Sequence, residues 1–291
     1  LRMSAEGTYD YDIDARFYDA ETDSWSDTIN PHKDGVSAEH GFVAMIPVGE
    51  GNTLMSWLDG RNTKTEAGYG EMTLRAGIFS ARGETLSEWE LDARVCDCCQ
   101  TSAAMSAAGP IIVYRDRSAE EIRDIYVTRY VNGDWTPPVA IHDDQWEIAG
   151  CPVNGPSVAA QGNFVAVGWF TAKDDSPKVQ LALSTDSGEH FSAPILVSGP
   201  DTIGRIDTAI LANGQVAVSW LDTKAETAEL TVSRFSAGGS LIDTTVVAGM
   251  SASRRSGFPI IETIGDDLFV TWTDTSEGPK VRVARIDFAS P

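Results

Sequence analysis

Two features of this sequence predict an all-β fold made of repeated units. Short β-type runs that each carry an aromatic residue recur along the chain, with the aromatics at Trp57, Tyr114, Trp169, Trp220 and Trp272. These positions are 51 to 57 residues apart, and a period near fifty with several strands per unit is typical of β-propellers. No stretch shows sustained helical periodicity, so almost no helix is expected. The sequence therefore predicts a single β-propeller domain over residues 1–291, with the five aromatics in its core.

Each repeated unit divides into four predicted strands. The first is a run of small residues, the second carries the aromatic, the third alternates apolar and polar residues, and the fourth is a short edge strand. The predicted first strands, and with them the blades, start near Phe42, Ser102, Ser157, Thr208 and Phe258.

The two ends of the chain bear on the blade count. Residues 8–30 contain two strand-like runs, 11–17 and 25–29, that read as the third and fourth strands of a partial blade, and the last unit stops after its third strand. We interpret the chain as a six-bladed propeller of four-stranded blades whose first blade is only partly represented. The alternative is that the N-terminal strands complete the last blade.

Composition excludes two classes of partner. The chain has 43 acidic and 22 basic residues and a net charge of −21, which would repel nucleic acid and anionic lipid surfaces. No apolar run approaches the roughly 20 residues that a membrane span requires.

The sequence indicates no particular oligomeric state. It has no signal peptide but begins at Leu1, so removal of an export leader, and a periplasmic or secreted location, are expectations.

The loops that lead into the first strands, here called leading loops, should open on one face of a propeller together with the loops between second and third strands. Arginines gather in these loops although the chain is acidic. They predict a site for an anionic small molecule or an acidic glycan, because guanidinium groups bind carboxylates well. The alternative is that arginines such as Arg61 and Arg123 form ion pairs between blades. The predicted ligand-binding residues are Arg61, Arg115, Arg117, Arg205, Arg255 and Asn154.

Glu39 and His40 lie in a leading loop directly before an apolar strand. A carboxyl group and an imidazole at such a position are candidates for acid–base catalysis. The alternative for His40 is a structural hydrogen bond.

The four cysteines occupy two leading loops. Cys96, Cys98 and Cys99 lie in one, and Cys151 lies in the next, 52 residues after Cys99. Since the two loops precede the first strands of consecutive blades, we expect Cys151 to lie close to the other three. Three interpretations stay open: a disulfide in an exported protein, a zinc or copper site if the cysteines are not disulfide-bonded, or buried free thiols.

One turn points to a known family. The stretch Ser184 to Phe191 fits the pattern Ser-x-Asp-x-Gly-x-x-Trp/Phe, in which the Ser and Asp side chains bond the turn backbone and Gly permits a positive φ. The pattern resembles the Asp-box of sialidase-like β-propellers. The stretches ARVCDCCQT, YRDRS, GCPVNGP and SGFP also resemble a bacterial subgroup labelled as exo-sialidases.

The resemblance implies a propeller that acts on acidic glycans. Sialidases bind the substrate carboxylate with arginines, and they use a tyrosine nucleophile paired with a glutamate and an aspartate as acid/base. By this resemblance Asp97 and Asp116 join Glu39 and His40 as catalytic candidates. The sequence departs from the family because it has no tyrosine after Tyr130. Tyr69, beside Glu71, is a substitute in a different blade.

Two hypotheses follow for function. One is an exported, sialidase-like glycoside hydrolase. The other is a non-catalytic binding or scaffold propeller with a cysteine-rich disulfide or metal site.

Overall fold

The computed structural model describes residues 1–224, 227–265 and 267–287. Within these ranges the chain forms twenty-six strands and two short 3-10 turns, η1 (Lys173–Asp175) and η2 (Arg254–Ser256), and it forms no α-helix. None of the described residues belongs to a helix with the length and hydropathy needed to cross a bilayer. The predicted all-β propeller class is confirmed.

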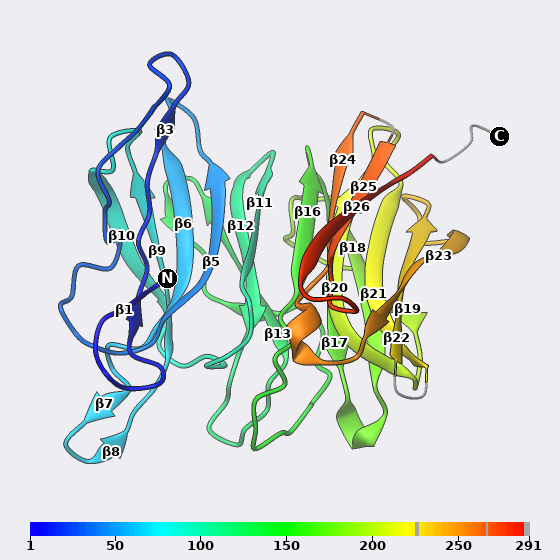
Figure 1. Cartoon of the computed structure of the whole chain (residues 1–291), viewed down its shortest axis with the longest axis horizontal. Coiled ribbons are helices and arrows are strands. Elements are labelled where there is room, and N and C mark those ends of the chain that lie inside the picture. Colours follow the sequence, from blue (N-terminus) through cyan, green and yellow to red (C-terminus); the bar gives the residue numbers. More distant parts are fainter. Residues whose placement is uncertain (225–226, 266, 288–291) are drawn as a thin grey trace.

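Five antiparallel sheets follow one another along the described part of the chain (Figure 1). The first comprises β5 (His40–Pro47), β6 (Thr53–Asp59), β9 (Thr73–Phe79) and β10 (Thr85–Asp92). The second comprises β11 (Ser102–Ser106), β12 (Gly109–Arg115) and β13 (Ile125–Val131), which pairs with both β14 (Asp134–Trp135) and β15 (Val139–Ala140). The third comprises β16 (Ser157–Gln161), β17 (Phe164–Thr171), β18 (Lys178–Ser184) and β19 (Ile195–Ser198).

The fourth sheet comprises β20 (Thr202–Ile210), β21 (Val216–Lys224), β22 (Thr227–Phe235) and β23 (Leu241–Ser251). The fifth has three strands, β24 (Ile260–Ile264), β25 (Asp267–Asp274) and β26 (Lys280–Ile286). Three small ladders complete the described structure: β1 (Arg2–Met3) with β2 (Tyr11–Asp12), β3 (Tyr18–Asp19) with β4 (Ser24–Trp25), and β7 (Lys64–Thr65) with β8 (Gly68–Tyr69).

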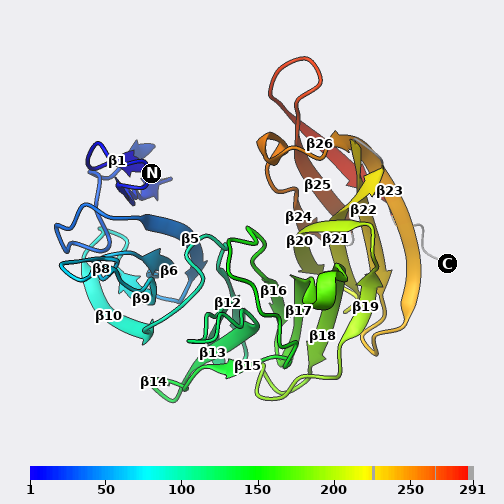
Figure 2. The ribbon, with the colours of Figure 1, turned by 90° about the horizontal axis from the view of Figure 1, so that it is seen from below.

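The first strand of each sheet lies next to that of the following sheet, in the order β5, β11, β16, β20, β24. Figure 2 shows the resulting arrangement, in which the sheets follow an arc from the N-terminal segment to β26. Strand β20 begins at Thr202, six residues before the predicted start at Thr208. Its early part is irregular, with register shifts between Thr202 and Asp207, and continuous pairing with β21 starts only at Asp207.

Burial follows from each strand's place in its sheet. The second strands β6, β12 and β17 are buried on both faces, which explains their continuous apolar runs. The outer strand β10 alternates between more and less exposed residues because only one face is covered. The predicted aromatic core is observed for Trp57, Tyr114, Trp169 and Trp220, each at most 3% exposed. Trp272 is half-buried and packs against the cluster between the fourth and fifth sheets.

The core is layered between neighbouring sheets and not concentrated at one centre. One apolar cluster lies between each pair of consecutive sheets. A fifth cluster joins the N-terminal segment to the first sheet, where Ile13 packs with Met55, Trp57 and Phe79. Residues 15–29 form an antiparallel hairpin through the Ala15–Ile29 bridge and β3–β4. The interpretation of residues 8–30 as part of a sixth blade stays a prediction.

The turn at residues 184–191 closes through its own side chains. The Ser184 Oγ accepts hydrogen bonds from the backbone N–H of Asp186 (3.3 Å) and of Gly188 (2.9 Å). Asp186 Oδ1 accepts from the Ser184 hydroxyl at 2.7 Å and from the His190 N–H at 3.0 Å. Gly188 has a φ of 79°, a conformation that favours glycine, so this glycine is required by the turn.

Candidate functional site

The two cysteine-bearing loops are covalently joined. Cys98 and Cys151 form a disulfide with their Cα atoms 6.1 Å apart, which confirms the predicted proximity of the two loops. Cys96 and Cys99 are free and buried. The zinc or copper site was predicted only for cysteines that are not disulfide-bonded, and Cys98 and Cys151 do not meet that condition.

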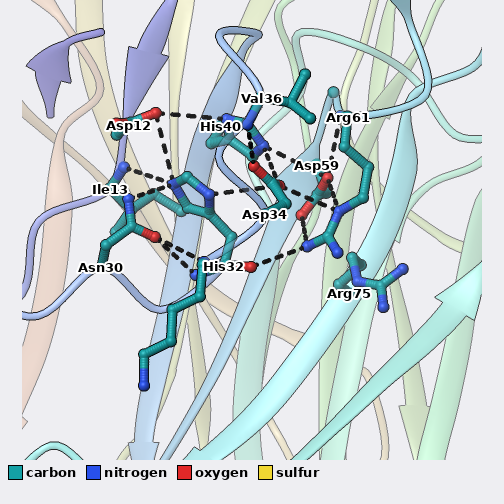
Figure 3. Close-up of polar contacts among 12 residues, drawn as sticks. Asp12, Ile13, Asn30, His32, Asp34, Val36, His40, Asp59, Arg61 and Arg75 are labelled. Atoms are coloured by element: carbon teal, nitrogen blue, oxygen red, sulfur yellow. Dashed lines mark hydrogen bonds and ion pairs between the residues drawn. The ribbon is translucent and has the colours of Figure 1, made fainter.

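A buried charge cluster fixes the N-terminal segment to the first sheet (Figure 3). Its members are Asp12, His32, Asp34, His40, Asp59 and Arg61. His40 Nε2 lies 2.9 Å from Asp34 Oδ2 and 3.5 Å from Asp59 Oδ1. Arg61 donates to both Asp59 oxygens, at 2.8 and 2.7 Å, and its Nε lies 3.2 Å from Asp34. The imidazole rings of His32 and His40 stack with centroids 3.7 Å apart.

The two histidines of the cluster have opposite pKa shifts. Burial lowers the pKa of His40, but Asp59 and Asp34 outweigh this effect, and its net pKa is raised. Burial and the neighbouring His40 lower the pKa of His32. Burial raises the pKa of Asp59, but hydrogen bonds from His40, Arg61 and Trp57 reverse the shift and hold it far below its usual range. The cluster thus holds the positive charges of Arg61 and His40 against buried carboxylates.

The donor set of this cluster does not suit a metal ion. Imidazole binds a metal in its ring plane, at about 2.0–2.1 Å for zinc. The His32 and His40 rings are parallel within 1° and stacked, so a single ion cannot lie in both ring planes. The Arg61 guanidinium already occupies Asp34 and Asp59. The arrangement therefore fits an internal salt bridge and not a metal centre.

This cluster contains two of the predicted site residues. His40 is fully buried, so it cannot touch a substrate, and the structural alternative is the one observed. Arg61 bonds Asp59, Asp34, Glu88 and the His32 carbonyl oxygen. Its guanidinium is occupied by the protein itself, so a ligand-binding role does not fit.

Arg115 is also a structural residue. It is 1% exposed, and its guanidinium donates to the carbonyl oxygens of Asn154 (2.9 Å), Arg123 (2.5 Å) and Phe170 (2.7 Å). These acceptors belong to the second and third blades, and the guanidinium also lies over the Trp146 ring. The side chain is enclosed in the contact between these blades, which does not fit the predicted ligand-binding role of Arg115.

The remaining acidic candidates lie in two places. Arg117 Nη1 is 3.4 Å from Asp97 Oδ2, and its guanidinium is held mainly by Glu121 at 2.7–3.1 Å. Tyr69 donates to Asp97 at 3.3 Å. Asp116 is elsewhere, beside Asp92, and burial together with the Asp92 charge raises its pKa to about 7.

A tyrosine–glutamate pair lies near Asp97. The Tyr11 hydroxyl donates to Glu39 Oε1. Burial and the Asp97 charge raise the pKa of Glu39, although Tyr11 lowers it. Burial and the contact with Glu39 raise the pKa of Tyr11. Tyr11 is not among the predicted site residues, although its position on the first N-terminal strand-like run was a signal present in the sequence.

The last part of the site is a pocket of about 310 Å³ beside the disulfide, here called the arginine pocket. Its lining residues are Pro152, Val153, Asn154, Ile203, Arg205, Ala252, Arg254 and Phe258. Arg205 is 8% exposed and donates to the carbonyl oxygens of Ala252, Ser253 and Gly257 and to the Ser256 hydroxyl. These bonds hold the η2 turn that carries Arg254. They leave the Arg205 Nε–H without an acceptor among the described residues.

The arginines of the arginine pocket differ from Arg61 and Arg117 because they are not paired with carboxylates in the described structure. In the described part of the chain, no carboxylate pairs with Arg205 or Arg254, and burial and the Arg254 charge lower the pKa of Arg205. Val153 and Arg205 have φ values of 51° and 56°, and non-glycine residues in this region are often found at functional sites.

Two further residues that were predicted to bind a ligand lie in or near this pocket. Asn154 lines it, but its amide bonds the Pro152 and Ile203 carbonyl oxygens and accepts from the Arg205 N–H at 2.7 Å. Asn154 therefore positions the pocket wall. Arg255, predicted as a ligand-binding residue, is exposed and does not line the pocket. Its neighbour Arg254 lines it instead, and spacing alone could not distinguish them.

The fold is similar to solved structures of carbohydrate-active enzymes. NanB sialidase from Streptococcus pneumoniae matches with a TM-score of 0.54 at 8% identity. The match covers 85% of this chain, which spans 59% of the length of the NanB chain. A glycosyl hydrolase from Bacteroides ovatus matches with a TM-score of 0.47 at 14% identity, covering 100% of this chain and 94% of that one. The α-L-arabinofuranosidase PaAbf62A from Podospora anserina has a TM-score of 0.43 at 10% identity, covering 85% and 91%.

No protein-family model matches the chain, and no curated protein sequence matches it. At such low identities the structural likeness shows the fold alone. The chain is a β-propeller with a cationic pocket beside a disulfide on an otherwise acidic molecule.

Proposed function

We propose that this protein is an exported β-propeller that binds an acidic glycan through a carboxylate held in the arginine pocket. One observation carries the proposal: the guanidinium groups of Arg205 and Arg254 share a pocket and have no carboxylate partner among the described residues. By contrast, Arg61 and Arg117 are each paired with acids of the protein. In a chain with a net charge of −21, arginines in a pocket that have no carboxylate partner favour an external anion.

The shape and lining of the pocket favour a sugar acid. A volume of about 310 Å³ is at the low end of the roughly 300–1,000 Å³ typical of small-molecule sites, so the pocket suits a ligand of monosaccharide size. Phe258, Ile203 and Val153 supply apolar surface for the ring, while the arginines supply donors for the carboxylate. A periplasmic or secreted location is part of the proposal, and the disulfide supports it because disulfides persist in oxidising compartments.

Arg254 and Arg255 form a matched pair for testing this proposal. Arg254→Ala should weaken the binding of a carboxylated monosaccharide by about 1.5–3 kcal/mol, the range for hydrogen bonds to charged groups, which corresponds to roughly 10–150-fold in Kd. Arg255→Ala should leave the Kd within about twofold, because this side chain lies outside the pocket. Isothermal titration with N-acetylneuraminic, glucuronic and galacturonic acids, and with neutral galactose as a control, measures both effects.

Two results would contradict the proposal. One is equal affinity of wild type and Arg254→Ala for every sugar acid that binds. The other is tighter binding of galactose than of galacturonic acid, since these sugars differ mainly in the carboxylate.

Glycoside hydrolysis is the second candidate function, and the contact between Tyr11 and Glu39 favours it. A tyrosine whose hydroxyl donates to a glutamate can act as a nucleophile while the glutamate accepts its proton. Asp97 lies close enough to raise the pKa of Glu39, and it could protonate a leaving group. Glu39 and Asp97 lie in two leading loops, and Tyr11 contacts Glu39.

A panel of fluorogenic sialosides and glucuronides tests this second candidate. If the protein is a hydrolase of this type, Tyr11→Phe and Glu39→Gln should each lower kcat/KM by at least about 100-fold. Tyr9→Phe is the control, since Tyr9 is exposed and should behave as wild type. Ligand binding without turnover of any substrate in the panel would contradict the hydrolase function and leave binding as the function.

A further inference from the structure

The four cysteines form one sulfur cluster with an inner and an outer pair. The outer pair is the Cys98–Cys151 disulfide, in which Cys151 is exposed and Cys98 is half-buried. The inner pair is Cys96 and Cys99, which are 1% and 2% exposed. Solvent therefore reaches the outer pair but not the inner pair, although the sulfur atoms of the two pairs lie close together.

Cys96 is the sulfur that connects the two pairs. Its Sγ lies 4.0 Å from Cys98 Sγ and 2.8 Å from Cys99 Sγ. A thiolate at Cys96 is therefore in contact with one sulfur of the existing disulfide and with the thiol of its inner partner. Both contacts are close enough for thiol–disulfide exchange after small side-chain movements, because the exchange needs direct approach of sulfur to sulfur.

The surroundings of Cys96 favour the reactive thiolate form. A hydrogen bond from Cys99, opposed by burial, and the nearby charges of Arg115 and Arg123 lower the pKa of Cys96 to about 6. Arg123 Nη1 lies 3.5 Å from the Cys96 sulfur. Burial raises the pKa of Cys99 well above its usual value, so Cys99 remains the thiol of the pair. Buried structural cysteines are normally unreactive, whereas thiolates beside arginines are nucleophilic.

We propose that the disulfide exchanges between the outer pair, Cys98–Cys151, and the inner pair, Cys96–Cys99. The Cys96 thiolate attacks Cys98 Sγ, a Cys96–Cys98 bond forms, the Cys98–Cys151 bond breaks, and Cys151 leaves as a thiolate. Cys99 then loses its proton and attacks Cys96 Sγ, which forms Cys96–Cys99 and releases Cys98 as a thiolate that takes up a proton. One disulfide and two thiols are present before and after, so no external oxidant or reductant is needed.

The exchange changes the binding face. It removes the covalent tie between the loop that carries Asp97 and the loop whose next residues, Pro152 and Val153, line the arginine pocket. It also places a free thiol at the exposed position 151, where the disulfide of another molecule can react with it by thiol–disulfide exchange.

The experiment traps the exposed thiols in the native, full-length chain. Protein that contains two thiols per chain by titration in denaturant is incubated with N-ethylmaleimide at pH 8 without denaturant, quenched in acid and mapped by peptide mass spectrometry. In wild type the label should accumulate at Cys98 and Cys151, with a Cys96–Cys99 disulfide in the same molecules. Cys99→Ser should stop after the first step, with label at Cys151 and a Cys96–Cys98 disulfide.

Cys96→Ser is the matched control because it lacks the attacking sulfur. Label at Cys151 should be at least about tenfold lower in this variant than in wild type, since no thiolate contacts Cys98. The proposal is overturned if wild type retains Cys98–Cys151 and carries label only at Cys96 and Cys99, or carries none. A count of zero or four thiols in the protein as purified would also overturn it, because the inner pair would then be oxidised already or the outer disulfide absent.

Discussion

Replacing Arg115 with methionine should lower the free energy of unfolding by about 3–5 kcal/mol, because each buried acceptor left without its donor costs about 1–3 kcal/mol. The guanidinium donates hydrogen bonds to the carbonyl oxygens of Asn154, Arg123 and Phe170, which lie in two blades. Methionine keeps an unbranched apolar side chain against Trp146 but supplies no donor. Urea unfolding followed by tryptophan fluorescence measures the change.

The control for this substitution is Arg282→Met in β26. The Arg282 side chain is 50% exposed and pairs with Asp274 at 3.1 Å, and exposed pairs of this kind contribute about 0.2–1 kcal/mol. If Arg115→Met cost no more than Arg282→Met, Arg115 would not be the strut between blades that its burial indicates.

Asp59→Ala should destabilise the protein by about 3–5 kcal/mol, the range for breaking a buried ion pair. Asp59 is fully buried and accepts hydrogen bonds from Trp57 Nε1 and from Arg61. Its removal leaves the charges of Arg61 and His40 with fewer buried partners. Because the folded-state pKa of Asp59 lies far below its usual value, its contribution is fully present above the unfolded-state pKa of about 3.9 and is lost as the pH falls through the folded-state pKa.

The matched control is Asp274→Ala, which removes the partner of the exposed Arg282 and should destabilise the protein much less, because ion pairs near the surface contribute little to stability. Thermal unfolding at pH 7 measures both variants. A loss for Asp59→Ala within the range of this control would mean that the cluster does not fasten the N-terminal segment to the first sheet.

The repeat could be predicted because propeller blades leave a strong sequence signal. The second strands of the first four sheets are buried on both faces, so an apolar run with an aromatic, as at Trp57 and Trp169, recurs with the blade. The proximity of Cys151 to Cys98 followed from the same repeat, since leading loops of consecutive blades are neighbours. The start of β20 was missed because bulges near Gly204 add residues that a regular repeat does not contain.

The roles of the arginines could not be predicted from the sequence. Arg115 and Arg205 both occur in loop or strand-end positions of the expected face, but one is enclosed between blades and the other borders a pocket. This difference depends on which carbonyl oxygens surround each guanidinium. Apart from the Arg123 oxygen, which lies 8 residues from Arg115, those oxygens come from segments 39 to 55 residues away. The choice between Arg254 and Arg255 likewise depends on the η2 turn, whose orientation Arg205 fixes.

The catalytic candidates show the same limit. Glu39 and His40 are adjacent in sequence, yet Glu39 contacts Tyr11 whereas His40 is fully buried among carboxylates. Adjacent residues at the start of a strand point to opposite sides, and the sequence does not say which side faces the N-terminal segment. The sequence alone therefore does not indicate that Tyr11 is the partner of Glu39.

The most direct test of the arginine pocket is a crystal structure of the protein with a sugar acid that binds in the titrations. The carboxylate should lie within about 3 Å of a guanidinium nitrogen of Arg254, the distance of a charge-assisted hydrogen bond, with the sugar ring against Phe258. A sugar acid bound elsewhere, or one whose carboxylate faces away from both Arg205 and Arg254, would contradict the proposed function.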